Sequence, residues 1–232
     1  MRWLHALLAA AMNAVPIVGV LAYGWSVPTI LVLFWLENVA IAVAHCVRIA
    51  AHRRLSRRAG HWQHEMTVNG VNKPTTLLAG YALMSGVFTF GHGIFVLLFA
   101  FLVIPEQAAG DPTARFDAAG FLLGARALLL ITLLDLGLDL VGLRERSYAW
   151  IDRETTRRMG RVIILHVGII FGAMLVAKAP VGMLMVLLGL KALVDLFAAL
   201  SRNRAGSADL SVAKGGGDPE AVLQAPPARA GR

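Results

Sequence analysis

Ionisable and polar side chains inside long apolar runs are the residues of this sequence that could do chemistry. The candidates for one buried polar site are Glu37, Asn38, His92, Asp135, His166, Lys191 and Asp195. An ionisable side chain near the bilayer centre costs at least about 2.5 to 3.5 kcal/mol on insertion scales, so each needs a partner, a cavity or a function. Since a purely structural bundle needs fewer such groups, we expect a buried functional site.

Helical rise sorts the ionisable groups of these runs into two depths. The group toward the middle of the membrane contains Glu37, His92, Arg126 and Lys191. The group closer to the cytoplasmic face contains His45, Asp135, Asp139, His166 and Asp195. We therefore expect two layers of polar side chains.

Imidazole and carboxylate groups are ligands for zinc, iron or manganese, and two histidines from different helices can clamp a haem. The candidate metal ligands are His92, His166 and Glu37, with Asp135 or Asp195 as a further carboxylate. No compact ligand motif is present, so metal and haem are hypotheses and no catalytic residue is assigned. The string from His61 through His64 to Glu65 matches no strong ligand pattern and predicts a solvated loop.

Several of these groups also have purely structural interpretations. Lys191 and Asp195, four residues apart, can neutralise each other. Asp139 is near enough to Arg144 and Arg146 to form an interfacial pair. His92 can satisfy one backbone carbonyl and do nothing else.

Three functional classes therefore stay open, and whether the protein is an enzyme is undecided. The first is a metal- or haem-binding membrane protein, which includes a membrane enzyme. The second is a proton-coupled transporter that uses the carboxylates and histidines as a relay. The third is a membrane scaffold or assembly subunit whose intramembrane charges pair to hold helices together.

The elements that must position these residues are membrane helices. The chain is 57% hydrophobic and 16% charged with mean hydropathy +0.66, whereas soluble domains are about a quarter charged. The predicted fold is an all-α polytopic membrane bundle, because apolar runs recur at the length of about 20 residues that spans a bilayer. The expected spans are 3–22, 26–50, 76–104, 118–143, 161–177 and 181–200, which together form a domain over 1–200.

Basic residues orient this bundle. The segments that join spans 2 to 3 and 4 to 5 carry most of the arginines, including Arg48, Arg53, Arg144 and Arg153. By the positive-inside rule both segments are cytoplasmic, and six spans then place both termini in the cytoplasm. We expect a prokaryotic cytoplasmic (inner) membrane, contacts with membrane lipids, a possible homo-oligomer and no nucleic-acid partner.

The ends of the chain, the glycine pairs and the single cysteine give weaker indications of structure. The first run could instead be a secretory signal peptide, so whether it is retained stays open. Residues 201–232 are rich in Ala, Gly and Pro and predict a disordered cytoplasmic tail. Gly120 with Gly124, and Gly168 with Gly172, predict close helix packing. Cys46 is the only cysteine, which excludes an intrachain disulfide.

Several short strings, taken together, resemble a known family. They are Phe34-Trp35-Leu36-Glu37-Asn38, Gly91-His92-Gly93, the stretch from Arg161 to His166, and Lys191 with Asp195 four residues later. In combination, over about residues 15–200, they resemble a prokaryotic multi-pass membrane family known as domain of unknown function 6498. The resemblance implies membrane residence and a shared helical fold, and its pattern points to Glu37, Asn38, His92, His166, Lys191 and Asp195. It implies no activity.

Overall fold

The computed structural model describes residues 2–56, 59–62, 64–68, 71–107, 110, 114–160, 189 and 193. Helices dominate these residues, which confirms the predicted helical class. Almost all of the expected spans 161–177 and 181–200, and the whole tail 201–232, lie outside the described residues.

Four of the described helices are long and apolar enough to cross a membrane, and they occupy the ranges of the first four predicted spans. The third runs without interruption from α3 through a π-helical stretch, η2, into α4. The elements are α1 (Arg2–Tyr23), α2 (Val27–Ser56), α3 (Leu77–Leu98), η2 (Phe99–Val103), α4 (Ile104–Gln107) and α5 (Ala118–Leu140).

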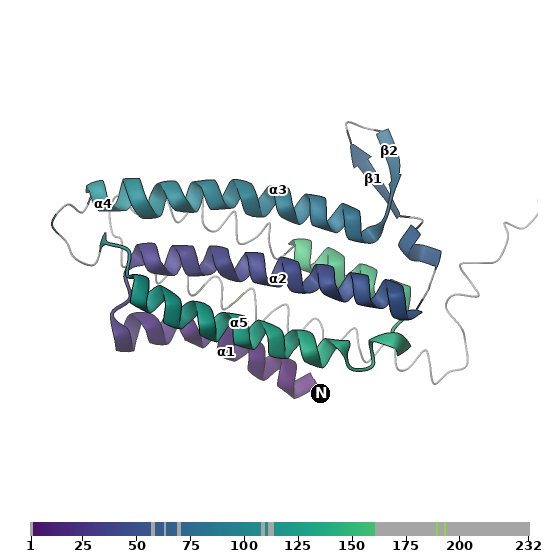
Figure 1. Cartoon of the computed structure of the whole chain (residues 1–232), viewed down its shortest axis with the longest axis horizontal. Coiled ribbons are helices and arrows are strands. Elements are labelled where there is room, and N and C mark those ends of the chain that lie inside the picture. The colour runs from purple at the N-terminus through teal and green to yellow at the C-terminus, as the bar shows by residue number, and fades with distance from the viewer. Residues whose placement is uncertain are drawn as a thin grey trace, which may run out of the picture.

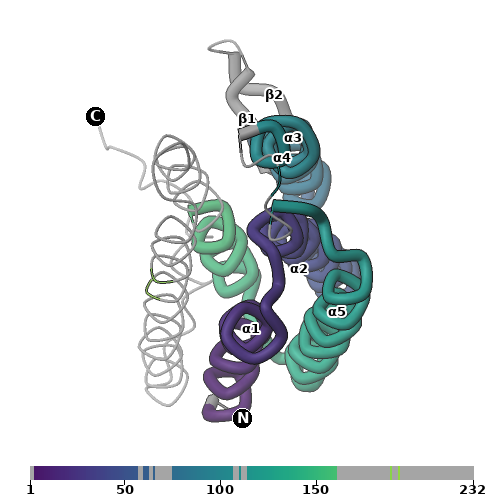
Figure 2. The backbone as a smooth tube through the Cα atoms, turned by 90° about the vertical axis from the view of Figure 1, so that its left-hand side faces the viewer, coloured from purple at the N-terminus to yellow at the C-terminus, as the bar shows by residue number. Residues whose placement is uncertain are grey.

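Helix α2 lies between α3 and α5, and α1 packs on α5 (Figures 1 and 2). Consecutive helices run in opposite directions, so the C-terminal half of α2 meets the C-terminal half of α5 and the first turns of α1. Trp35 joins α2 to α3, because its ring nitrogen donates to the Thr89 carbonyl (3.0 Å) and its ring lies over Gly93. This arrangement gathers the polar ends of three helices at one end of the bundle.

Trp25 packs at the opposite end of the bundle, in the turn between α1 and α2. Its buried ring lies against Gly19, Gly120 and Gly124. A Cβ atom at Gly120 would come within 2.7 Å of the ring, and one at Gly124 within 2.9 Å. The predicted close approach at Gly120 and Gly124 therefore admits an indole side chain.

The segments predicted as loops contain ordered elements, so that prediction was wrong. After α2 come η1 (Ala59–Trp62) and a hairpin of β1 (His64–Val68) and β2 (Val71–Thr75), in which His64 pairs with Thr75. After α5 come η4 (Leu143–Glu145) and a helix over residues 148–160. The physical reason is packing: Ile151 is fully buried with Ile49, Leu77 and Tyr81 in a second apolar cluster.

Candidate functional site

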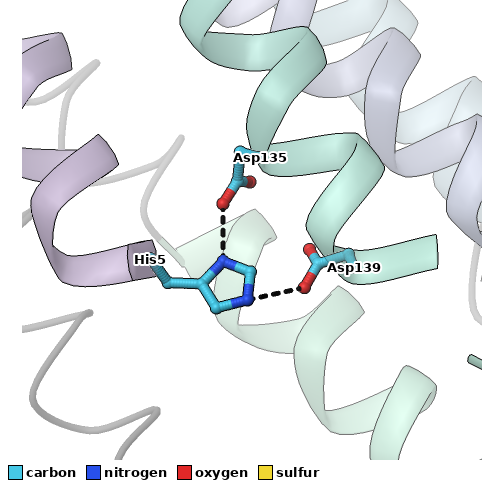
Figure 3. Close-up of side chains that lie close together, drawn as sticks. All are labelled: His5, Asp135 and Asp139. Carbon is cyan, nitrogen blue, oxygen red and sulfur yellow. Dashed lines mark hydrogen bonds and ion pairs between the residues drawn. The ribbon is translucent and has the colours of Figure 1, made fainter. Parts of the chain in front are cut away.

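Three ionisable side chains from α1 and α5 meet near one end of the bundle (Figure 3). Nδ1 of His5 lies 2.8 Å from Oδ1 of Asp135, and Nε2 of His5 lies 3.5 Å from Oδ1 of Asp139. Asp135 and Asp139 are one helical turn apart, so they share a face of α5. We call His5, Asp135 and Asp139 the His–Asp–Asp cluster.

Arg48 of α2 holds the other oxygen of each carboxylate. Its Nη2 lies 2.6 Å from Oδ2 of Asp135, and its Nε lies 2.6 Å from Oδ2 of Asp139. The Arg48 side chain is only 1% exposed. Since Arg48 was counted among the arginines of a cytoplasmic loop, that placement was wrong: α2 continues to Ser56 and buries it.

The helix over residues 148–160 extends this network. Glu154 is buried and pairs with Arg157 and Arg158, each at 2.9 Å. Arg158 lies 4.0 Å from Oδ2 of Asp139. The expected interfacial pairing of Asp139 with Arg144 or Arg146 is replaced here by contacts with Arg48, His5 and Arg158.

A second contact fastens the same helix to α2. Nε2 of His45 lies 2.9 Å from the Thr155 hydroxyl, and that hydroxyl donates to the Ile151 carbonyl (2.8 Å). Because the Thr155 hydroxyl already donates its hydrogen to that carbonyl, it can only accept from His45, so Nε2 of His45 is the donor. The edge of the His45 ring also meets Tyr81 of α3, with ring centroids 4.7 Å apart. Three helices therefore meet at His45.

Three residues of the predicted middle region, Glu37, His92 and Arg126, lie within the described residues. Glu37 and His92 are both buried, and counting from the contact of Trp35 with Thr89 along these antiparallel helices offsets them by about 7.5 Å, roughly one and a half helical turns. Asn38 is partly buried. Arg126 is exposed on α5. The remaining candidates His166, Lys191 and Asp195 lie outside the described residues.

The His–Asp–Asp cluster has the separations of a metal site. One ligand atom from each of the three side chains lies within 4.8 Å of the others. Two ligands on one tetrahedral metal, with bonds of about 2.1 Å, lie about 3.4 Å apart, and Nε2 of His5 lies 3.5 Å from Oδ1 of Asp139. Asp135 contacts the other ring nitrogen, Nδ1, at 2.8 Å, so either its carboxylate or the imidazole must turn for all three side chains to share one ion. Arg48 holds the second oxygen of both carboxylates, as outer partners of metal ligands do.

The chemistry of the donors narrows the metal. One imidazole nitrogen with two carboxylate oxygens suits zinc, manganese or iron. His5 and Asp135 are 18% and 21% exposed, so an ion can reach the cluster from one side. Of the predicted ligands only Asp135 belongs to this cluster among the described residues; Glu37 and His92 are not part of it, and His166 and Asp195 lie outside the described residues.

A pair of histidines lies beyond this cluster, at the end of α2. Nδ1 of His52 is 2.7 Å from Nε2 of His61, and Nε2 of His52 is 3.0 Å from the Arg146 carbonyl. Because a carbonyl only accepts, His52 donates from Nε2 and accepts at Nδ1 from His61. Both rings are buried, and the edge of Tyr148 meets His61. The predicted solvated loop at His61 was therefore wrong.

Acid should weaken this histidine contact. Burial, with the charges of His52 and Arg53, lowers the pKa of His61 to about 4, while burial and Asp152 raise the pKa of Tyr148 to about 12, so the tyrosine stays neutral. In the unfolded chain the His61 pKa is near 6.5. The stability that neutral His61 contributes is thus complete above pH 6.5 and is lost as the pH falls from 6.5 through about 4.

The test is the free energy of unfolding in detergent as a function of pH. Between about pH 7.5 and pH 5 the wild type should lose roughly 1 to 2 kcal/mol more than a His61→Phe variant, which keeps an aromatic ring but has no proton to bind. Parallel pH profiles for the two proteins would contradict the assignment.

Comparison with known proteins adds one finding. The model of a family described as "Family of unknown function (DUF6498)" matches residues 1–210. The chain belongs to this family. No curated protein and no solved structure matches the chain. The sequence resemblance is thereby confirmed, and for this DUF6498 protein the site must be judged on its own geometry.

Sequence reasoning about the DUF6498 chain selected Asp135 as a site candidate and placed Asp139 in the same layer with a structural interpretation, but it missed His5 and Arg48. His5 lies in the first turns of α1, near the expected membrane boundary. A polar residue at that depth does not by itself indicate a functional site. Arg48 was explained by topology alone. The available signal was the helical phase of α2, since Arg48 lies within about 20° of the Glu37 stripe, a face that was already expected to be buried.

Proposed function

We propose that this DUF6498 protein is a multi-pass integral membrane protein that binds one divalent transition metal at the His–Asp–Asp cluster. The observation that carries the proposal is the geometry of the cluster: an imidazole and two carboxylates face one another while Arg48 holds both outer oxygens. In such a site the metal would link α1 to α5 and present open coordination positions to a ligand.

The proposal includes six spans in a prokaryotic cytoplasmic membrane, with both termini and the metal site on the cytoplasmic side. The support is the gathering of basic residues at the end of the bundle where α2 and α5 finish, among them Arg53, Arg54, Arg144 and Arg153. A fluorescent C-terminal reporter that folds only in the cytoplasm tests the orientation. A fusion that is expressed at a normal level but does not fluoresce would contradict a cytoplasmic C-terminus.

Metal titration of the purified protein tests the site. In detergent free of chelator, the wild type should bind one Mn²⁺ or Zn²⁺, measured by calorimetry and by elemental analysis after desalting. Asp135→Asn should weaken binding at least tenfold, since loss of an outer partner alone typically costs 10- to 100-fold. Asp152→Asn, a carboxylate of the 148–160 helix outside the cluster, should bind as the wild type does.

Two results of this titration would contradict the proposed metal site. No stoichiometric metal in a folded wild type would exclude the site, as would equal affinities for the wild type and Asp135→Asn. Folding is checked separately by the unfolding midpoint of each variant, so a lost site is distinguished from a lost fold.

A scaffold or assembly subunit is the second candidate, and one observation favours it. Arg48 already pairs with both carboxylates, so the same contacts can serve only to fasten α1, α2 and α5. In that case Asp135→Asn lowers the free energy of unfolding, and metal changes neither protein's midpoint.

A further inference from the structure

We infer that the metal-loaded cluster takes a phosphate oxygen as an additional ligand, from free phosphate or from a lipid headgroup. The inference rests on the proposed metal site and names the class of ligand that the site would bind. Charge balance, coordination number and position in the bundle each point to this ligand.

Among the ion pairs of the described residues, the charges around the cluster balance without a metal. The described network holds three carboxylates and three guanidinium groups, which sum to zero when the histidines are neutral. They are Asp135, Asp139 and Glu154, and Arg48, Arg157 and Arg158. A divalent ion brings this network to +2. Because unbalanced charge away from water is costly, the loaded site favours an anion beside the metal.

The cluster also leaves positions on the metal open. It offers three ligand atoms, whereas zinc takes four ligands and manganese commonly six. His5 and Asp135 are partly exposed, whereas Asp139 is 4% exposed and lies beside Arg158, which is 12% exposed. A further ligand would enter from the exposed side.

Arg158 supplies the group that selects phosphate. Its Nη2 lies 4.0 Å from Oδ2 of Asp139, and its side chain is 12% exposed. A planar guanidinium beside a metal ion is a favoured arrangement for binding phosphate oxygens. Arg157 also pairs with Glu154 but makes no contact with Asp139 among the ion pairs of the described residues, so it offers a matched comparison.

The depth of the cluster matches lipid headgroups. Asp135 is five residues before the end of α5 and His5 is three residues after the start of α1, distances of about 8 Å and 5 Å along the helix axes. Both side chains thus lie close to the ends of membrane-length helices. A phospholipid headgroup is within reach there, as is phosphate from the aqueous side.

The experiment measures Mn²⁺ affinity in maltoside micelles, which contain no phosphate, by the electron paramagnetic resonance signal of free Mn²⁺. Adding inorganic phosphate or phosphatidylglycerol should tighten Mn²⁺ binding at least tenfold, and by linkage Mn²⁺ tightens phosphate binding equally. A response to phosphatidylglycerol alone identifies a lipid source, and a response to inorganic phosphate alone a soluble one. Asp135→Asn serves as the blank for Mn²⁺ complexes in solution, and sulfate tests for a general salt effect.

Variants at the two arginines separate phosphate binding from structure. Arg158→Gln should lose most of the phosphate effect, measured as the ratio of its Mn²⁺ affinities with and without phosphate, whereas Arg157→Gln should retain that ratio. If Mn²⁺ binds the wild type and phosphate changes nothing, the inference is overturned and the metal site stands. If Mn²⁺ does not bind under any condition, both proposals fail.

Discussion

Replacing Arg48 with methionine should destabilise the protein by about 3 to 5 kcal/mol, the range observed when one partner of a buried ion pair is removed. The Arg48 side chain is 1% exposed and contacts both Asp135 and Asp139 at 2.6 Å. Without it, two carboxylates remain close together with their main cationic partner gone. The measurement is the free energy of unfolding in detergent micelles at neutral pH.

Two comparisons make this result specific. Arg144→Met removes an exposed arginine of the same end of the bundle and should change stability by no more than about 0.5 kcal/mol. A triple variant, Arg48→Met with Asp135→Asn and Asp139→Asn, should regain part of the loss because no buried charge is left unpaired. An Arg48→Met protein as stable as Arg144→Met would refute the buried pairing.

Replacing Trp25 with alanine should destabilise by about 3 to 5 kcal/mol, as is typical when a large aromatic side chain is truncated in a packed core. The indole fills the space left by Gly19, Gly120 and Gly124 and contacts two helices besides its own turn. Little relaxation is expected, because those backbones are held in place by the long helices.

Trp3→Ala is the matched control, since Trp3 is 88% exposed in the first turn of α1. Gly124→Leu approaches the same contact from the other side and should destabilise by about 1 to 3 kcal/mol through overpacking. Similar losses for Trp25→Ala and Trp3→Ala in the same detergent would show that the glycine-lined slot contributes little.

The helices were predictable from sequence because a single property defines them. A bilayer-length apolar run fixes both the type and the approximate bounds of an element, and the run 118–143 contains α5 (Ala118–Leu140). The helix at 148–160 was missed for the converse reason. Its many charges suggested a loop, although Ile151 and Thr155 bury one face of it.

The site was less predictable because sequence does not state which helices touch. Depth along each helix could be counted, and it placed Asp135 and Asp139 in one layer. His5 and Asp135 are 130 residues apart in the chain and meet because α1 contacts α5. That contact depends on packing between helices, which no local sequence pattern encodes. The positive-inside rule explains arginines by topology, so it also concealed that Arg48 is buried as the ion-pair partner of Asp135 and Asp139.

The position of Arg48 also constrains how the protein is made. Its partner Asp135 lies 87 residues further along the chain, which at about 5 to 20 residues per second is synthesised roughly 4 to 17 s later. During that interval Arg48 has no α5 carboxylate to meet, and a lone arginine is strongly disfavoured in the hydrocarbon. The cluster lies near the helix ends, where the arginine can stay solvated in the meantime, so α2 becomes fastened to α5 through Arg48 only after α5 has left the ribosome.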